Sequence, residues 1–141
     1  MKNIPIAVAL VASIGCTYIL LMSTDKNDME ELKSNAVSIQ IGVFKSLENA
    51  TNMQERLGGY VVKVDDVYRV YYGILDNDEH INYITNYLTS RGISYYINEL
   101  FLTDDVKSEL DVCEQKMNKE KLDNEKLKIM FDFIKNYEEV I

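Results

Sequence analysis

An uncharged and mostly apolar run of 19 residues, Ile4 to Met22, stands close to the start of the chain. As an α-helix, a run of this length spans about 28 Å, which matches the hydrocarbon thickness of a bilayer. Pro5 falls in the first turn, where its missing N–H would have no helical partner in any case. The run therefore predicts a transmembrane helix over residues 4–22, a signal anchor preceded by a short cytoplasmic N-terminus, residues 1–3.

The charges on either side of this run predict its orientation. Lys2 precedes it, whereas mostly acidic residues follow it, among them Asp25, Asp28, Glu30 and Glu31. By the positive-inside rule we expect a single-pass protein of the cell membrane, with a cytoplasmic N-terminus and an extracytoplasmic remainder. Two other interpretations stay open: a cleaved signal peptide, and lipidation at Cys16, since residues 13–16 faintly resemble a bacterial lipobox. Both also export the rest of the chain.

Charge and composition exclude several function classes. The formal net charge is −8 and no segment forms a basic patch, so we expect no nucleic-acid partner. His80 is the only histidine, and Cys16 and Cys113 are the only cysteines, so no paired Cys/His spacing predicts a zinc site. The sequence also carries no nucleophile elbow and no glycine-rich phosphate loop. We therefore predict a protein that is not an enzyme, without metal or cofactor, in which His80 is a solvated helix residue.

Residues 23–36 are polar and acidic and predict a linker, after which the apolar pattern changes to a period of two. The alternation over residues 37–44 predicts a strand. A helical apolar spacing from Leu47 to Leu57 then predicts a helix, which Gly58-Gly59 ends.

The same logic predicts the second half of this domain. Two β-rich runs, residues 60–64 and 67–72, flank Asp65-Asp66 and predict a tight hairpin. Asp78 is a predicted cap for a helix that ends near Gly92, and residues 93–98 predict a last strand. The fold class is therefore α+β, a small βαββαβ domain over residues 37–102, with both helices on one face of an antiparallel sheet and the other face open.

Two motifs in this domain carry a family resemblance. Gln40-Ile41-Gly42-Val43-Phe44 resembles the Q-x-G-x-F opening of SPOR (sporulation-related repeat) domains, and Val67–Gly73 resembles their "YRV-x-x-G" strand. The resemblance implies an RNP-like, ferredoxin-like fold that binds bacterial peptidoglycan, in particular glycan strands stripped of stem peptides, in division or sporulation. The sequence departs from the family's pattern at Ile74-Leu75, where Pro-Phe is frequent, and in its C-terminal extension.

Strand parity and the resemblance together predict the binding surface. If Val70 and Tyr72 face the helices, Arg69 and Tyr71 face the open side of the sheet. Amide, guanidinium and aromatic groups suit a carbohydrate, because they bond its polar groups and stack on its rings. The predicted glycan-binding residues are Ser38, Gln40, Gly42, Lys63, Arg69, Tyr71 and Tyr96.

Residues 103–141 contain no Gly or Pro and predict a long amphipathic helix that begins at Thr103-Asp104-Asp105. Its apolar positions need a partner, because an isolated amphipathic helix is marginal in water. Three partners stay open: its own domain, a second copy of the chain, or another envelope protein. The last of these supports an alternative function, a protein–protein scaffold with a degenerate SPOR-like fold.

Overall fold

The structure, a computed structural model, describes residues 34–139. The predicted cytoplasmic residues 1–3, the predicted transmembrane helix over residues 4–22 and most of the predicted linker lie outside this range. Between residues 34 and 139, no helix combines the length and the apolar character that a membrane crossing requires.

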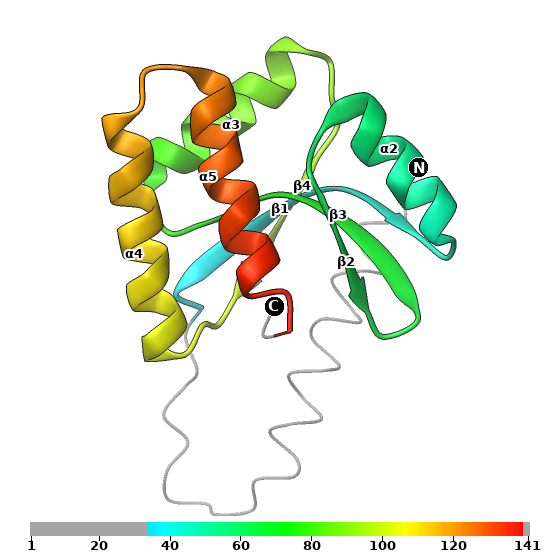
Figure 1. The fold of residues 1–141 in the computed structure, drawn as a ribbon, viewed down its shortest axis with the longest axis horizontal. Coiled ribbons are helices and arrows are strands. Elements are labelled where there is room, and N and C mark those ends of the chain that lie inside the picture. Colours follow the sequence, from blue (N-terminus) through cyan, green and yellow to red (C-terminus); the bar gives the residue numbers. More distant parts are fainter. Residues whose placement is uncertain (1–33, 140–141) are drawn as a thin grey trace, which may run out of the picture. The chain divides into compact units, whose positions relative to one another are not determined.

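The predicted α+β class and the β-α-β-β-α-β order of the domain are confirmed, and two further helices follow (Figure 1). The strands form one antiparallel sheet in the order β2-β3-β1-β4. The predicted last strand begins later than expected, and β3 extends past Tyr72 to Leu75. The elements are β1 (Ala36–Phe44), α2 (Leu47–Leu57), β2 (Tyr60–Val64), β3 (Val67–Leu75), α3 (Asp78–Ser90), β4 (Tyr96–Leu100), α4 (Asp104–Lys119) and α5 (Asp123–Asn136).

Local chemistry explains the connections within the domain. Asp65 adopts a positive φ of 54°, which aspartate tolerates, and the two-residue turn places Val64 opposite Val67 as predicted. Gly58 and Gly59 follow α2 with φ values of 87° and 100°. The cap of α3 is one residue earlier than predicted, because the Asn77 side chain, not that of Asp78, accepts a hydrogen bond of 2.8 Å from the Glu79 amide.

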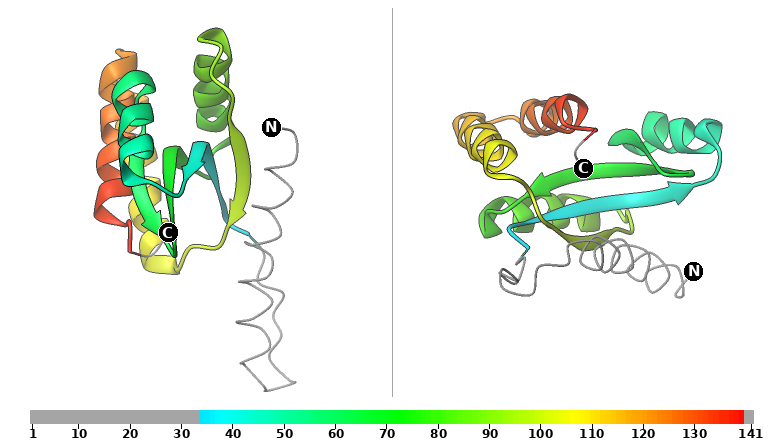
Figure 2. Two further views of the ribbon diagram at one scale, coloured as in Figure 1. Left: turned by 90° about the vertical axis from the view of Figure 1, so that its right-hand side faces the viewer. Right: turned by 90° about the horizontal axis from the view of Figure 1, so that it is seen from below.

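Helices α2 and α3 lie on the same side of the sheet, as predicted (Figure 2, left). The buried side chain of α2 is Ala50, and those of α3 include Ile84 and Leu88, all of which are fully buried. His80 is also buried, at 5% exposure, and the prediction of a solvated residue is wrong. Its ring lies against α4, where Nε2 is 2.8 Å from Asn118 Oδ1.

The prediction of one long C-terminal helix is also wrong. Residues 120–122 separate α4 from α5, and the two helices pack against each other and against the domain. The sequence around this break is polar apart from Leu122, which is 62% exposed, so no apolar stripe favours a continuous helix there. The break lets Leu110 and Met117 of α4 and Met130 and Ile134 of α5 all become fully buried. The structure therefore does not separate residues 103–139 from the domain, and the buried apolar positions of this segment no longer call for another protein.

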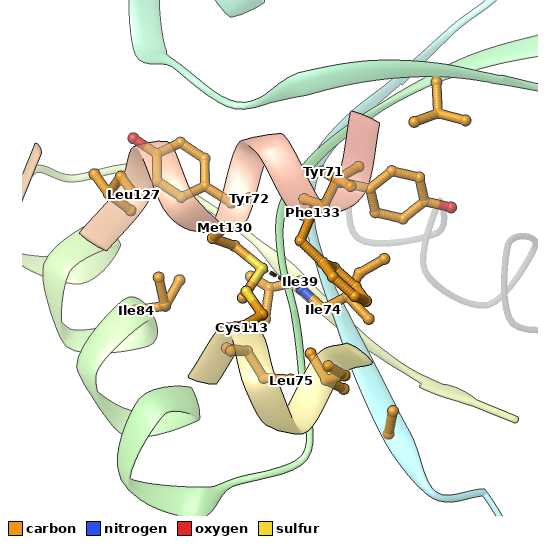
Figure 3. Packing of buried hydrophobic residues seen from close by; sticks show 14 of the residues in the cluster. Ile39, Tyr71, Tyr72, Ile74, Leu75, Ile84, Cys113, Leu127, Met130 and Phe133 are labelled. Atoms are coloured by element: carbon orange, nitrogen blue, oxygen red, sulfur yellow. Dashed lines mark hydrogen bonds between the residues drawn. The ribbon is translucent and has the colours of Figure 1, made fainter. Parts of the chain in front are cut away.

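The α4–α5 hairpin covers part of a sheet edge. Strand β2 pairs with β3 only as far as Tyr71, which leaves the last residues of β3 without a strand on that side. Helix α5 lies along this stretch (Figure 2, right), and Met130 Sδ accepts a hydrogen bond of 3.3 Å from the Ile74 amide (Figure 3). The ring of Phe131 meets that of Tyr72 edge-on, with centroids 5.3 Å apart. Helix α5 therefore supplies contacts that a longer β2 would have made.

Candidate functional site

Four side chains form one row across all four strands. Gln40 of β1 lies opposite Tyr71 of β3 on one side and Tyr96 of β4 on the other, and Tyr71 in turn lies opposite Tyr60 of β2. Cross-strand partners in an antiparallel sheet project from the same face, so these residues form a continuous strip. We call Tyr60, Tyr71, Gln40 and Tyr96 the tyrosine row.

Two irregularities in the β1–β3 ladder set this arrangement. The register shifts between Ile39 and Gln40, so that Gln40 lies opposite Tyr71 and not Tyr72. It shifts back between Gln40 and Gly42, so that Gly42 lies opposite Val70. Bulges of this kind re-aim side chains locally. They place Gln40 and Tyr71 on one face and move Gly42 to the other.

Two of the predicted site residues therefore lie on the face opposite the tyrosine row. A Cβ on Gly42 would be 2.7 Å from the Sδ atom of Met53 on α2, so Gly42 faces the helices and permits their close approach. Lys63 lies opposite Tyr68, with its ammonium 5.9 Å from the centre of that ring, whereas Arg69 lies opposite Val62. Neighbouring residues of a strand point to opposite faces, so Lys63 and Arg69 do not share a surface.

The other five predicted site residues do share the face of the tyrosine row. Arg69 Nη1 donates a hydrogen bond of 3.4 Å to Gln40 Oε1. Ser38 is two residues from Gln40 on β1 and lies opposite Asn98 of β4. Five of the seven predicted residues, Ser38, Gln40, Arg69, Tyr71 and Tyr96, therefore lie on one face of the sheet.

These five residues are less exposed than the prediction of an open surface implies. Gln40 is 1% exposed, Ser38 2% and Tyr71 4%, whereas Arg69 and Tyr96 are half-buried. The buried residues belong to β1 and β3, which are the inner strands of the sheet and have neighbours on both sides. Burial raises the pKa of Tyr71, while the positive charge of Arg69 lowers it in part, so the phenol is neutral at physiological pH.

The centre of the row holds hydrogen-bond donors that the described part of the chain does not satisfy. Gln40 Nε2 and Arg69 Nε are both buried, and neither has a hydrogen-bond partner among residues 34–139. Leaving such a donor unpaired costs about 1–3 kcal/mol, and native proteins rarely retain one without a reason. Because both groups only donate, the site is complementary to acceptor oxygens such as those of a carboxylate or an amide carbonyl.

Tyr60 is a member of the row that the sequence-based set omits. The sequence contains the information needed to place Tyr60 in the row. A two-residue turn at Asp65-Asp66 fixes the β2–β3 register, and that register places Tyr60 opposite Tyr71. An argument from the alternation of side chains within each strand does not use that register, so it does not find Tyr60. The bulges, in contrast, have no clear mark in the sequence.

Two hollows lie away from the row. One, of about 280 Å³, is lined by Phe44 and residues of α2, and the other, of about 200 Å³, lies between α4 and α5. Both are smaller than the usual 300–1,000 Å³ of a small-molecule site.

No family model and no curated protein matches the chain. Among solved structures, it is similar to the solution structure of the peptidoglycan binding domain of the B. subtilis cell wall lytic enzyme CwlC. The two are 21% identical, with a TM-score of 0.37, and the match covers 47% of this chain and 90% of that one. At this identity and TM-score, the likeness assigns neither a fold nor a ligand to the chain.

Proposed function

We propose that the protein binds the glycan strands of bacterial peptidoglycan through the tyrosine row, and that its role is binding and not catalysis. The observation that carries this proposal is the pair of buried, unsatisfied donors, Gln40 Nε2 and Arg69 Nε, between tyrosine rings. The Q-x-G-x-F and YRV-x-x-G motifs of the SPOR resemblance support it, because Gln40, Arg69 and Tyr71 all lie within them.

Glycan strands stripped of stem peptides present the complementary groups. Their N-acetyl carbonyls accept single hydrogen bonds, for which Gln40 Nε2 is a suitable donor. The lactyl carboxylate of each muramic acid accepts two parallel bonds from a guanidinium, for which Arg69 Nε and an Nη are suited. Tyr60 and Tyr96 are half-buried and offer rings on which the apolar faces of sugars can stack.

A ligand reaches Gln40 only if the side chains over it move. The Arg69–Gln40 hydrogen bond of 3.4 Å lies outside the usual range for N–H···O bonds, so breaking it costs little. A carboxylate that draws the guanidinium toward itself would free Gln40 Oε1 and expose Nε2 at the same time. We therefore expect Arg69 to act first and Gln40 to complete the site.

Sedimentation of the full chain with purified sacculi tests the proposal. One sample of sacculi is left intact, and a second is treated with an amidase that removes the stem peptides. We expect the protein to sediment with both, and more with the stripped strands. A net charge of −8 disfavours non-specific adhesion to an anionic polymer, so sedimentation would report directed contacts. Absence from both pellets, under conditions that sediment an established peptidoglycan-binding domain, would refute the proposal.

The sequence supports a proposed location for this activity. We propose that residues 4–22 anchor the chain in the cell membrane and that the domain lies on the outer side, where peptidoglycan is found. Protease added to intact spheroplasts should then digest the domain, and protection of the domain would contradict this orientation.

A further inference from the structure

Three carboxylates meet where α4 packs against the connection between β3 and α3. Asp76 follows β3 directly, and Asp111 and Glu114 lie one turn apart on α4. One oxygen of each lies within 4.8 Å of the others. A cluster of acidic groups is common on protein surfaces, but Glu114 is only 5% exposed, and burying a carboxylate requires compensation.

His80 supplies a separate indication that a cation belongs there. Its Nε2 atom is 2.8 Å from Asn118 Oδ1, and an amide oxygen can only accept, so Nε2 carries the proton. In the neutral imidazole, Nδ1 then presents a lone pair. This atom is buried, has no hydrogen-bond partner among the described residues, and lies 3.4 Å from Glu114 Oε1. Two acceptors that face each other at this distance need a proton or a metal cation between them.

Lys107, the positive charge already present in the cluster, forms no ion pair with Glu114 in the described structure. Lys107 Nζ forms ion pairs with Asp76 and, at 2.8 Å, with Asp111. Glu114 Oε1 receives only long bonds of 3.3 Å from the Asp76 and Asn77 amides. One lysine therefore faces three carboxyl groups, and Glu114, the most buried of them, has no side-chain cation of its own beside it among the described residues.

We propose that Asp76, Asp111, Glu114 and the Nδ1 atom of His80 form a binding site for a divalent transition-metal ion of the zinc class. An imidazole nitrogen among the donors favours zinc over calcium or magnesium, which prefer oxygen alone. The Asn118 contact to Nε2 matches the outer-shell hydrogen bond that orients most metal-binding histidines.

The geometry requires three adjustments. The cluster within 4.8 Å contains the three carboxylates but not His80, so the imidazole, now 3.4 Å from Glu114, would have to move closer to Asp76 and Asp111. Zinc–ligand distances near 2.0–2.2 Å place tetrahedral donors roughly 3.5 Å apart, so the carboxylates would close in by about an ångström. Lys107 would also leave the cluster, which its long, flexible and half-buried side chain permits. Lys107 thus occupies the place of the ion in the metal-free protein. A bound ion would join α4 to the β3–α3 connection and α3, and so fasten the C-terminal hairpin to the domain.

Calorimetric titration of the chelator-treated, detergent-solubilised full chain with zinc chloride tests this site. We expect saturable binding of one ion per chain and a rise in melting temperature. Glu114→Gln and His80→Gln should each weaken binding by at least about tenfold. Lys107→Met should bind at least as tightly as the wild type, because the competing amine is gone. Asp132→Asn, which removes an exposed acid from α5, should change nothing.

Each contrary outcome overturns the proposal. If neither the wild type nor Lys107→Met binds zinc, the cluster is only an ion-paired contact between helices. If His80→Gln and Glu114→Gln, both folded by circular dichroism, bind as the wild type does, the zinc is an adventitious ion only. If calcium binds as tightly as zinc, His80 is not a ligand. The site is independent of the tyrosine row, so Arg69→Ala should leave zinc binding unchanged.

Discussion

Arg69 Nη1 donates a hydrogen bond of 3.4 Å to Gln40 Oε1, while Gln40 Nε2 and Arg69 Nε have no hydrogen-bond partner within residues 34–139. A weak bond between two incompletely satisfied groups is easily exchanged for stronger bonds to a ligand. This relationship underlies the first two predictions.

Replacing Arg69 by alanine should reduce sacculus binding by roughly tenfold to a hundredfold, because it removes a charge-assisted contact worth about 1.5–3 kcal/mol. Arg56→Ala is the matched control, since it removes the same charge from an exposed position on α2. Sedimentation with sacculi and thermal melting should be measured for both variants. Equal binding by the two would show that the row is not the glycan site, and unfolding of Arg69→Ala would show that Arg69 is structural.

Gln40→Leu should abolish glycan binding without lowering the melting temperature. Leucine has a similar volume and removes an amide whose unpaired donor costs about 1–3 kcal/mol, while the hydrogen bond that it sacrifices is weak. We expect the free energy of unfolding to stay the same or to rise by about 1 kcal/mol. Chemical denaturation checks stability, and sedimentation checks binding. A marked loss of stability would mean that the Gln40 amide is a structural group.

Gly59→Ala should destabilise the domain more than Gly92→Ala. Both glycines have positive φ, at 100° and 68°, so both variants lose about 1–2 kcal/mol through backbone strain. At Gly59 the new Cβ would also lie 2.9 Å from the Tyr71 carbonyl oxygen, whereas nothing lies within 4 Å at Gly92. Urea denaturation of both variants measures the difference. Equal losses would contradict the close approach of this connection to β3.

Met130→Ala should destabilise the chain by about 2–5 kcal/mol, because Met130 is fully buried and its sulfur accepts the Ile74 amide. Leu122→Ala, at an exposed position in the α4–α5 connection, should change stability by less than about 0.5 kcal/mol. Thermal and denaturant melts of both variants test whether α5 packs on β3. A negligible effect of Met130→Ala would mean that it does not.

Local signals in the sequence account for much of the fold. The period-two runs, the Gly58-Gly59 stop and the Asp65-Asp66 turn each act over a few residues, so they predict the order of the elements and the β2–β3 hairpin correctly. Strand parity also places Gln40, Arg69 and Tyr71 on one face, which the ladder confirms.

What the sequence by itself determined is therefore the succession of helices and strands and the faces of most strand residues, because these depend on side chains close together in the chain. Only the tertiary structure decided the bulges that turn Gly42 toward α2, the burial of Gln40, and the folding of residues 104–136 into a hairpin over the edge of β3. Each of these depends on contacts between distant segments. The most consequential example is His80, which a local pattern assigns to solvent and which packing against α4 buries beside Glu114.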